Sequence, residues 1–143
     1  MDLKGYNSDD VNSQNLPKSD FPLMLDMEDK TDKKGNIIKS WTPSKDNNDL
    51  WISTFISVLK NANYNTILYG NKGFYDFKTS NKFGSQPLWH AAYPTAPKHS
   101  PEWDKPIIAN GWSDWTLWQF SSSNEKLDLN LMRKDFFDSP KLT

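Results

Sequence analysis

The feature that most restricts the fold of this 143-residue chain is a pair of short apolar runs separated by a helical segment. Residues 21–27 (FPLMLDM) fit a buried strand, and residues 65–70 (NTILYG) fit a second strand. Between them, over residues 48–62, apolar side chains recur at helical spacing, with Asp46 or Asn47 available as the N-cap. This order of strand, helix and strand predicts an α/β fold with a parallel sheet.

The rest of the chain is predicted to extend this sheet. Further strands are expected at residues 87–93, 115–122 and 126–132. A short turn or helix is expected at residues 73–77. Residues 1–20 are polar and show no period, so we expect a loose lead-in there. The predicted organisation is one domain over residues 21–138, followed by a tail over residues 139–143.

The composition excludes several classes of function. The formal charge of -1 provides no basic surface for nucleic acid or anionic lipid, so neither partner is expected. The absence of cysteine rules out disulfides, thiolate metal sites and cysteine nucleophiles. His90 and His99 lack the spacing of metal ligands, so no metal site is expected and buried or solvent-facing histidines are predicted. The first residues lack the pattern of a signal peptide, and no apolar run approaches the roughly 20 residues of a membrane span.

Two carboxylates, Asp26 and Glu28, stand two residues apart at the end of the first predicted strand. Residues i and i+2 of a strand share a face, so both side chains point away from Leu25 and Met27, with their α-carbons about 6.6 Å apart. Like charges at this distance raise one of the two pKa values, which leaves one carboxyl protonated beside an ionised neighbour. Glycoside hydrolysis needs this division of roles. Two solvated carboxylates that cap the next loop would have the same spacing. The spacing alone therefore does not decide between a catalytic pair and a solvated pair.

The order of five short motifs resembles the glycoside hydrolase family 25 muramidases, also called Chalaropsis-type lysozymes. The motifs are PLMLDMED, TILYG, PLWHAAY, WTLWQFSS and LDLNLM, and the similarity extends from about Phe21 to Asn130. In that family a strand ending in D-x-E is followed by a strand with Tyr, an L-W-x-A-x-Y strand, an L-W-Q-aromatic strand and a late D-x-N. Each motif alone is weak, but five of them in this order are specific.

The resemblance implies hydrolysis of the β-1,4 bond between N-acetylmuramic acid and N-acetylglucosamine in bacterial peptidoglycan, without metal or cofactor. Glu28 corresponds to the acid that protonates the leaving oxygen. Asp26 corresponds to its charged partner, which stabilises an oxocarbenium-like centre or the acetamido group of the substrate. Asp128 matches a late acidic position that binds or orients substrate, and an Asp that caps a loop is the alternative. The implied place of action is the bacterial cell wall, for a phage or bacterial lysin.

The same resemblance places aromatic side chains along a saccharide-binding groove. The matching positions are Tyr69, Trp89, Tyr93 and Trp118. Their ring faces would stack on pyranose C–H faces, although each could equally fill the core, because a buried ring removes roughly 150–250 Å² from water. Gln119, next to Trp118, is expected to bind a carbohydrate hydroxyl or a neighbouring backbone group.

The fold that the resemblance implies is a TIM-barrel-like (β/α) barrel with its site at the carboxyl ends of the strands. The barrel of the family begins with a strand that carries a D-x-S motif, and no such strand precedes Phe21, so we expect an incomplete barrel that lacks its N-terminal strands. The site then also lacks one acidic residue, and full activity is not expected. Two hypotheses follow: a muramidase whose missing strands a second chain supplies, or a non-catalytic remnant that binds peptidoglycan.

Overall fold

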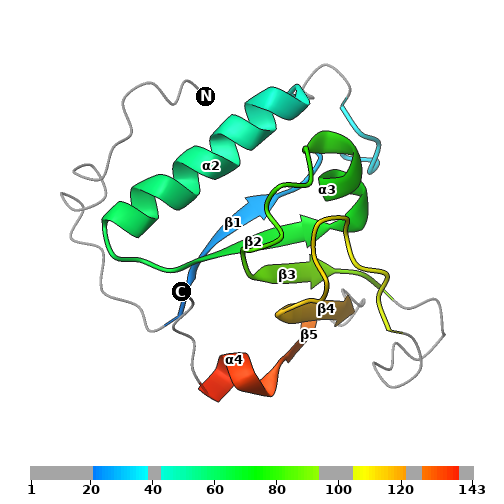
Figure 1. Ribbon diagram of the computed structural model, residues 1–143. Helices are drawn as coiled ribbons and strands as arrows, with labels where there is room; N and C mark the ends of the chain where they lie inside the picture. The colour runs from blue at the N-terminus through cyan, green and yellow to red at the C-terminus, as the bar shows by residue number, and fades with distance from the viewer. Residues whose placement is uncertain (1–20, 39–42, 94–104, 122–126, 139–143) are drawn as a thin grey trace.

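The computed structural model describes residues 21–38, 43–93, 105–121 and 127–138, which form a mixed α/β fold (Figure 1). One sheet contains, in this order, β1 (Leu23–Met27), β2 (Thr66–Asn71), β3 (Leu88–Ala91), β4 (Leu117–Ser121) and β5 (Leu129–Met132). The helices of the described residues are α2 (Lys45–Asn61), α3 (Lys72–Lys78) and α4 (Lys134–Asp138). The predicted strands and the predicted helix are all present, with bounds that differ by a few residues.

The first four strands are parallel neighbours, as the alternation of strands and helices predicted (Figure 1). β5 differs because it pairs with β4 in the antiparallel direction. Only residues 122–128 separate these two strands, whereas a parallel connection needs a crossover of about a dozen residues or more. The short connection therefore turns the chain back on itself, and the prediction of a parallel sheet is wrong for this strand.

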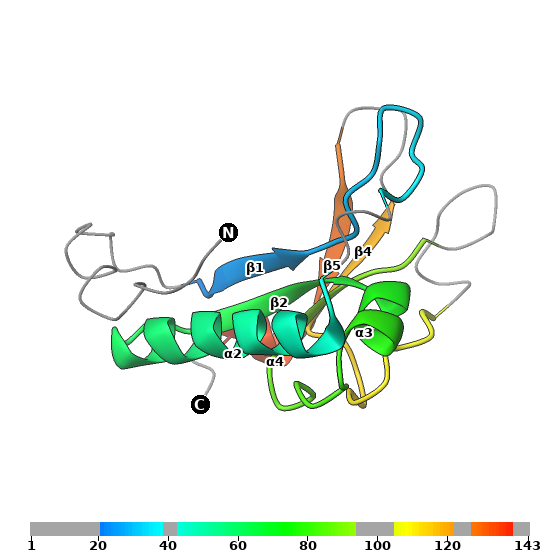
Figure 2. The same cartoon turned by 90° about the horizontal axis from the view of Figure 1, so that it is seen from above.

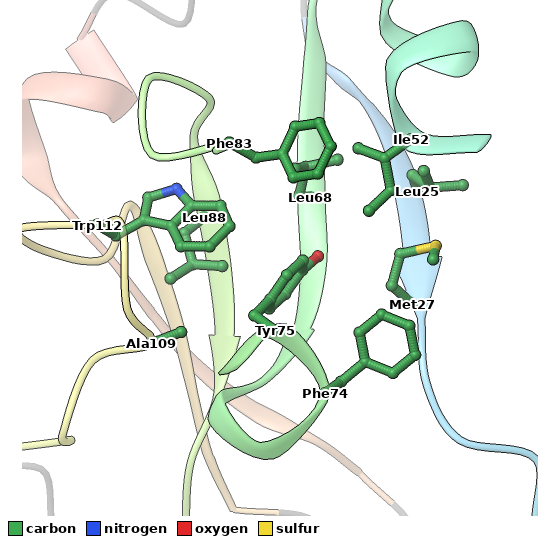
Figure 3. Close-up of a cluster of buried hydrophobic side chains, with 10 residues drawn as sticks. All are labelled: Leu25, Met27, Ile52, Leu68, Phe74, Tyr75, Phe83, Leu88, Ala109 and Trp112. Atoms are coloured by element: carbon green, nitrogen blue, oxygen red, sulfur yellow. The ribbon is translucent and has the colours of Figure 1, made fainter. Parts of the chain in front are cut away.

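One face of the sheet is covered by α2 and α3, which lie on the same side of β1 and β2 (Figure 2). The main core fills the space between these layers (Figure 3). Its buried side chains are Leu25, Met27, Ile52, Leu68, Phe74, Tyr75, Phe83, Leu88, Ala109 and Trp112. Leu68 and Leu88 are fully buried, and burial of a Leu side chain contributes roughly 1.5–3 kcal/mol. Alternate strand residues must therefore face the opposite side of the sheet.

The opposite face is apolar at one end and polar at the other. Ile67, Leu117 and Phe136 form a second buried cluster, and Trp89 and Met132 pack against it. Phe136 belongs to α4, which the sequence did not predict because its five residues are too few to show a helical period. Near the carboxyl ends of β1, β2 and β4 this face carries polar side chains instead.

The longest helix, α2, begins one turn earlier than predicted. Ser44 is its N-cap, and the Ser44 hydroxyl accepts a hydrogen bond from the backbone N–H of Asn47 at 3.2 Å. The predicted caps, Asp46 and Asn47, instead lie within the first turn. There the carboxylate of Asp46 is well placed to interact with the positive end of the helix dipole.

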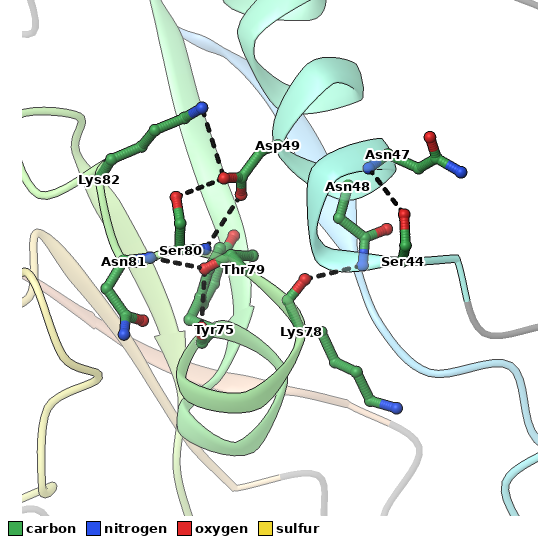
Figure 4. Close-up of polar contacts among 10 residues, drawn as sticks. All are labelled: Ser44, Asn47, Asn48, Asp49, Tyr75, Lys78, Thr79, Ser80, Asn81 and Lys82. Carbon is green, nitrogen blue, oxygen red and sulfur yellow. Dashed lines mark hydrogen bonds and ion pairs between the residues drawn. The ribbon is translucent and has the colours of Figure 1, made fainter.

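A group of buried polar contacts ties the start of α2 to the segment that follows α3 (Figure 4). The Asn48 side-chain amide donates to the carbonyl of Lys78 at 2.9 Å. Asp49, a residue that is 5% exposed, accepts through its carboxylate from the Ser80 hydroxyl and from the Ser80 backbone N–H at 3.1 Å, and this carboxylate lies 3.4 Å from Lys82 Nζ. Burial alone would raise the pKa of Asp49, but the contacts with Ser80 and Lys82 outweigh it and hold that pKa below its ordinary value.

The Asp49→Asn variant is expected to unfold about 1–3 kcal/mol more easily at neutral pH, because Ser80 and Lys82 lose a charged partner at a buried site. The folded pKa of Asp49 lies below the unfolded one, so its contribution is present above the unfolded pKa and is lost as pH falls through the folded pKa. Urea unfolding should therefore show a difference between wild type and variant that shrinks in acid. Asn47→Ala, at an exposed position of the same turn, is the control, and an equal loss in both variants would contradict the assignment.

Candidate active site

The register between strands gathers most of the predicted site residues on the face opposite α2 and α3. Asp26 of β1 pairs with Tyr69 of β2, and Tyr69 pairs with Trp89 of β3. Gln119 of β4 pairs with Asn130 of β5 in an adjacent row. Paired residues of neighbouring strands project from the same face, so the register alone brings these side chains close together.

The two carboxylates follow the alternation that the sequence predicted. Leu25 and Met27 are each 6% exposed and face the main core, whereas Asp26 and Glu28 are both exposed. Glu28 lies directly after the last residue of β1. The prediction that both carboxylates share one face is therefore confirmed.

The surroundings of these carboxyls favour their protonated forms. Burial raises the pKa of Glu28 above its ordinary value of 4.5, and the negative charge of Asp26 raises it further. A hydrogen bond with the Tyr69 hydroxyl acts in the opposite direction and does not cancel these effects. Burial also raises the pKa of Asp26. Glu28 therefore retains its proton at a higher pH than an isolated glutamate does.

Tyr69 lies at the centre of the cluster. Its hydroxyl donates a hydrogen bond to Gln119 Oε1 at 2.6 Å. Burial raises the pKa of the Tyr69 phenol, and this pKa is raised further by Glu28, Tyr93, Asp26 and Asp128. Asp26 and Glu28 after β1 and Asp128 before β5 thus all raise the pKa of the same phenol.

The rim of the cluster is formed by Trp89, Tyr93 and Asn130. The Trp89 ring meets the Tyr69 ring edge to face, with 5.5 Å between centroids, and Trp89 Nε1 donates to Asn130 Oδ1 at 2.8 Å. Tyr93 is 48% exposed, and its hydroxyl lies 3.2 Å from Gln119 Oε1. Asn130 was not predicted as a site residue, although its place two residues after Asp128 is the same alternation that joined the first two carboxylates.

Trp118 does not belong to this cluster. It pairs with His90 and is only 2% exposed, on the side of the sheet that carries α2 and α3. Its ring packs against Trp115 and Phe120, and its Nε1 donates to the carbonyl of Ala92 at 2.6 Å. The prediction that Trp118 stacks on substrate does not fit this placement, because neighbouring strand residues point to opposite faces and Gln119 takes the site face.

His90 is fully buried among residues that take no part in the cluster. Its Nε2 lies 3.1 Å from the carbonyl oxygen of Ile107, and burial lowers its pKa, which favours the neutral ring. His99 lies outside the described residues. Within the described part of the chain, no group of three or more His, Asp or Glu side chains is arranged to hold a metal ion. Among those residues, too, no helix combines the length and the apolar character that a membrane crossing requires.

The site residues fall within a region that matches a known family. Residues 5–129 match the glycosyl hydrolases family 25. The chain belongs to this family. No curated protein matches the family 25 chain significantly.

Three solved structures illustrate what this family 25 chain is similar to. The spore cortex lytic enzyme SleM of Clostridium perfringens is 26% identical with a TM-score of 0.60, over 88% of this chain and 42% of SleM. The CTP1L endolysin is 20% identical with a TM-score of 0.58, over 85% and 38%. A family 25 glycosyl hydrolase from Bacillus anthracis is 19% identical with a TM-score of 0.62, over 94% and 63%. The family 25 chain thus spans less than two thirds of each of these structures.

The Asp26→Asn variant is expected to lower the pKa of Glu28, because it removes the negative charge that disfavours ionisation of that carboxyl. A ¹³C NMR titration of the glutamate side chains measures this shift directly. Asp29→Asn is the matched control, since Asp29 is adjacent to Glu28 but lies 3.9 Å from Lys78 Nζ. An unchanged Glu28 pKa in Asp26→Asn would show that the two carboxylates do not interact.

Proposed function

We propose that this family 25 chain carries the acidic part of a muramidase site, which hydrolyses the β-1,4 bond between N-acetylmuramic acid and N-acetylglucosamine in peptidoglycan. The observation that carries the proposal is the raised pKa of Glu28 beside Asp26, on an open sheet face shared with Tyr69 and Trp89. A protonated carboxyl next to a second carboxylate is the arrangement that glycosidic bond cleavage requires.

In the proposed reaction, Glu28 donates its proton to the glycosidic oxygen while the bond from that oxygen to C1 breaks. The positive charge that develops at C1 and the ring oxygen is stabilised by the Asp26 carboxylate, either directly or by way of the acetamido group of the substrate acting as internal nucleophile. Water then attacks C1 and gives a proton back to Glu28, which restores the starting state.

The polar and aromatic rim is proposed to bind the saccharide. Trp89 and Tyr93 offer ring surface beside the carboxylates, and Gln119 and Asn130 offer amide groups. Asp128 is proposed to orient the substrate, and its charge already acts on the Tyr69 phenol. Sugars present both C–H faces and hydroxyls, so a site of this mixed composition suits them.

The relatives support a cell-wall polymer as the substrate. The similar structures include a spore cortex lytic enzyme, an endolysin and a muramidase from Acremonium alcalophilum. We therefore propose that the chain acts on the bacterial cell wall.

The sheet is proposed to form part of a TIM-like barrel. β1 is an edge of the sheet within the described residues, and a closed barrel requires a further strand along such an edge.

The Glu28→Gln variant is expected to clear purified peptidoglycan about 10²–10⁴-fold more slowly than the wild type, because the amide has no proton to give to the leaving oxygen. Clearing by the wild type should decrease as pH rises through the Glu28 pKa. Borohydride reduction of the products should place reduced muramic acid at the new chain ends. Asp29→Asn, which changes the next residue, should clear at the wild-type rate.

The same assay distinguishes a muramidase from the alternative, a remnant that binds peptidoglycan without cutting it. Negligible clearing by wild type and Glu28→Gln, with both proteins sedimenting with the cell walls, would refute the enzyme and support a peptidoglycan-binding remnant. If the proteins neither clear nor sediment with the walls, both functions are wrong.

A further inference from the structure

The Asn130 side chain makes a hydrogen bond that fixes how its amide is turned. Its Oδ1 accepts from Trp89 Nε1 at 2.8 Å. An indole N–H can only donate, so the oxygen of the amide, and not its NH₂ group, must face the ring. The NH₂ group then points the other way, where Asn130 Nδ2 lies 3.4 Å from the carbonyl oxygen of Asp128. The amide oxygen of Asn130 is therefore used inside the protein.

The bond between Trp89 and Asn130 crosses one strand of the sheet. Trp89 lies on β3 and Asn130 lies on β5, with β4 between them. Neighbouring strands are about 4.8 Å apart, so the two backbones are separated by about 10 Å. The long indole reaches its partner only when it leans across β4. The hydrogen bond at its far end thus favours one orientation of the side chain.

The remaining contacts of Trp89 support its ring and leave part of the residue open. Its ring meets the Tyr69 ring edge to face, and it also packs against the second buried cluster. The residue is nevertheless only half-buried. Apolar packing is non-directional, whereas a hydrogen bond requires a defined distance and angle. The bond to Asn130 therefore defines the rotation of the indole more narrowly than packing does.

We propose that Asn130 is a positioning residue that holds the indole of Trp89 in the orientation in which its open surface receives a saccharide ring of the substrate. A side chain that is already ordered does not have to be immobilised by the ligand, which lowers the free-energy cost of binding. The inference deepens the proposed function and rests on it, because it assigns a task to the saccharide-binding rim. This task uses the amide oxygen and is distinct from any contact of the NH₂ group with the sugar.

The Asn130→Ala variant is expected to move the Trp89 indole N–H signal upfield in ¹⁵N–¹H NMR spectra and to speed its exchange with water, because the hydrogen loses its acceptor. The chain has seven tryptophans, and the indole signal missing in Trp89→Phe identifies Trp89. Asn130→Asp keeps an oxygen acceptor and should keep the signal downfield. Leu129→Ala, at the neighbouring exposed position of β5, is the control and should leave the signal unchanged.

The same variant is expected to bind a soluble tetrasaccharide of alternating N-acetylglucosamine and N-acetylmuramic acid about 2- to 10-fold more weakly, because the ligand must then order the indole itself. An NMR titration of full-length proteins that all carry Glu28→Gln measures the affinity without hydrolysis. Asn130 is exposed, so the urea midpoint of Asn130→Ala should stay close to that of the wild type. A large fall in that midpoint would indicate a general structural role and would overturn the proposal.

A double-variant comparison distinguishes positioning from direct contact with the sugar. Phenylalanine has no N–H, so in a Trp89→Phe background Asn130→Ala should leave the affinity where Trp89→Phe alone sets it. An equal loss in both backgrounds would show that the amide acts on the saccharide itself and would overturn the proposal. If Trp89→Phe abolishes binding, a shifted Trp89 signal with weaker binding in Asn130→Ala supports the proposal.

Three further results would also decide the matter. An unchanged Trp89 signal or an unchanged affinity in Asn130→Ala would overturn the proposal, as would a lack of tetrasaccharide binding by the parent Glu28→Gln protein. If Asn130→Ala does not fold, the wild type gives the answer. Slow exchange of the Trp89 indole hydrogen relative to free tryptophan supports the proposal, and exchange as fast as in free tryptophan overturns it.

These measurements are independent of catalysis. A shifted Trp89 signal and weaker tetrasaccharide binding in Asn130→Ala, together with no clearing of peptidoglycan by the wild type, would support the positioning role and refute the proposed hydrolysis. Clearing by the wild type with an unchanged Trp89 signal in Asn130→Ala would support the hydrolysis and refute the positioning role.

Discussion

The parallel register of the first four strands is the constraint on which the site depends. It places Asp26 beside Tyr69 and Tyr69 beside Trp89, and it places Gln119 in the next row of paired residues. All four residues lie on strands, so no long loop is needed to position them. Because parallel strands end at the same edge of a sheet, polar residues near their carboxyl ends converge there. The core on the other face, between the sheet and α2 and α3, holds this register in place.

The proposed chemistry depends on partial burial of like charges. Asp26 and Glu28 are exposed enough to meet a ligand, yet burial raises the pKa of each. Raised carboxyl pKa values oppose folding above those values, since the native state must then hold charges that the unfolded chain solvates better. The contacts of Asp49 with Ser80 and Lys82 lower the pKa of Asp49 and therefore favour folding at neutral pH. The carboxylate beside α2 thus stabilises the folded chain, whereas the two carboxylates of the candidate site destabilise it.

Local periodicity made part of this site predictable. The two-residue spacing of Asp26 and Glu28 defines a shared face in any strand, and the structure confirms it. The same rule, applied to Trp118 and Gln119, shows that adjacent residues cannot both face the site, so the prediction of both was inconsistent. Which of them faces it depends on their pairing with His90 and Ala91, and pairing is not a local property.

The sequence by itself determined the strands, the main helix, the position of the acidic pair and the family, because each depends on residue order over a few neighbours or on a series of short motifs. Only the tertiary structure decided that β5 runs antiparallel, that Trp118 turns to the core and that Asn130 joins the site. It alone also joined Tyr69 to Gln119, fifty residues apart in the chain. These features arise from contacts between distant segments, whose free energies depend on packing and register that no local pattern records.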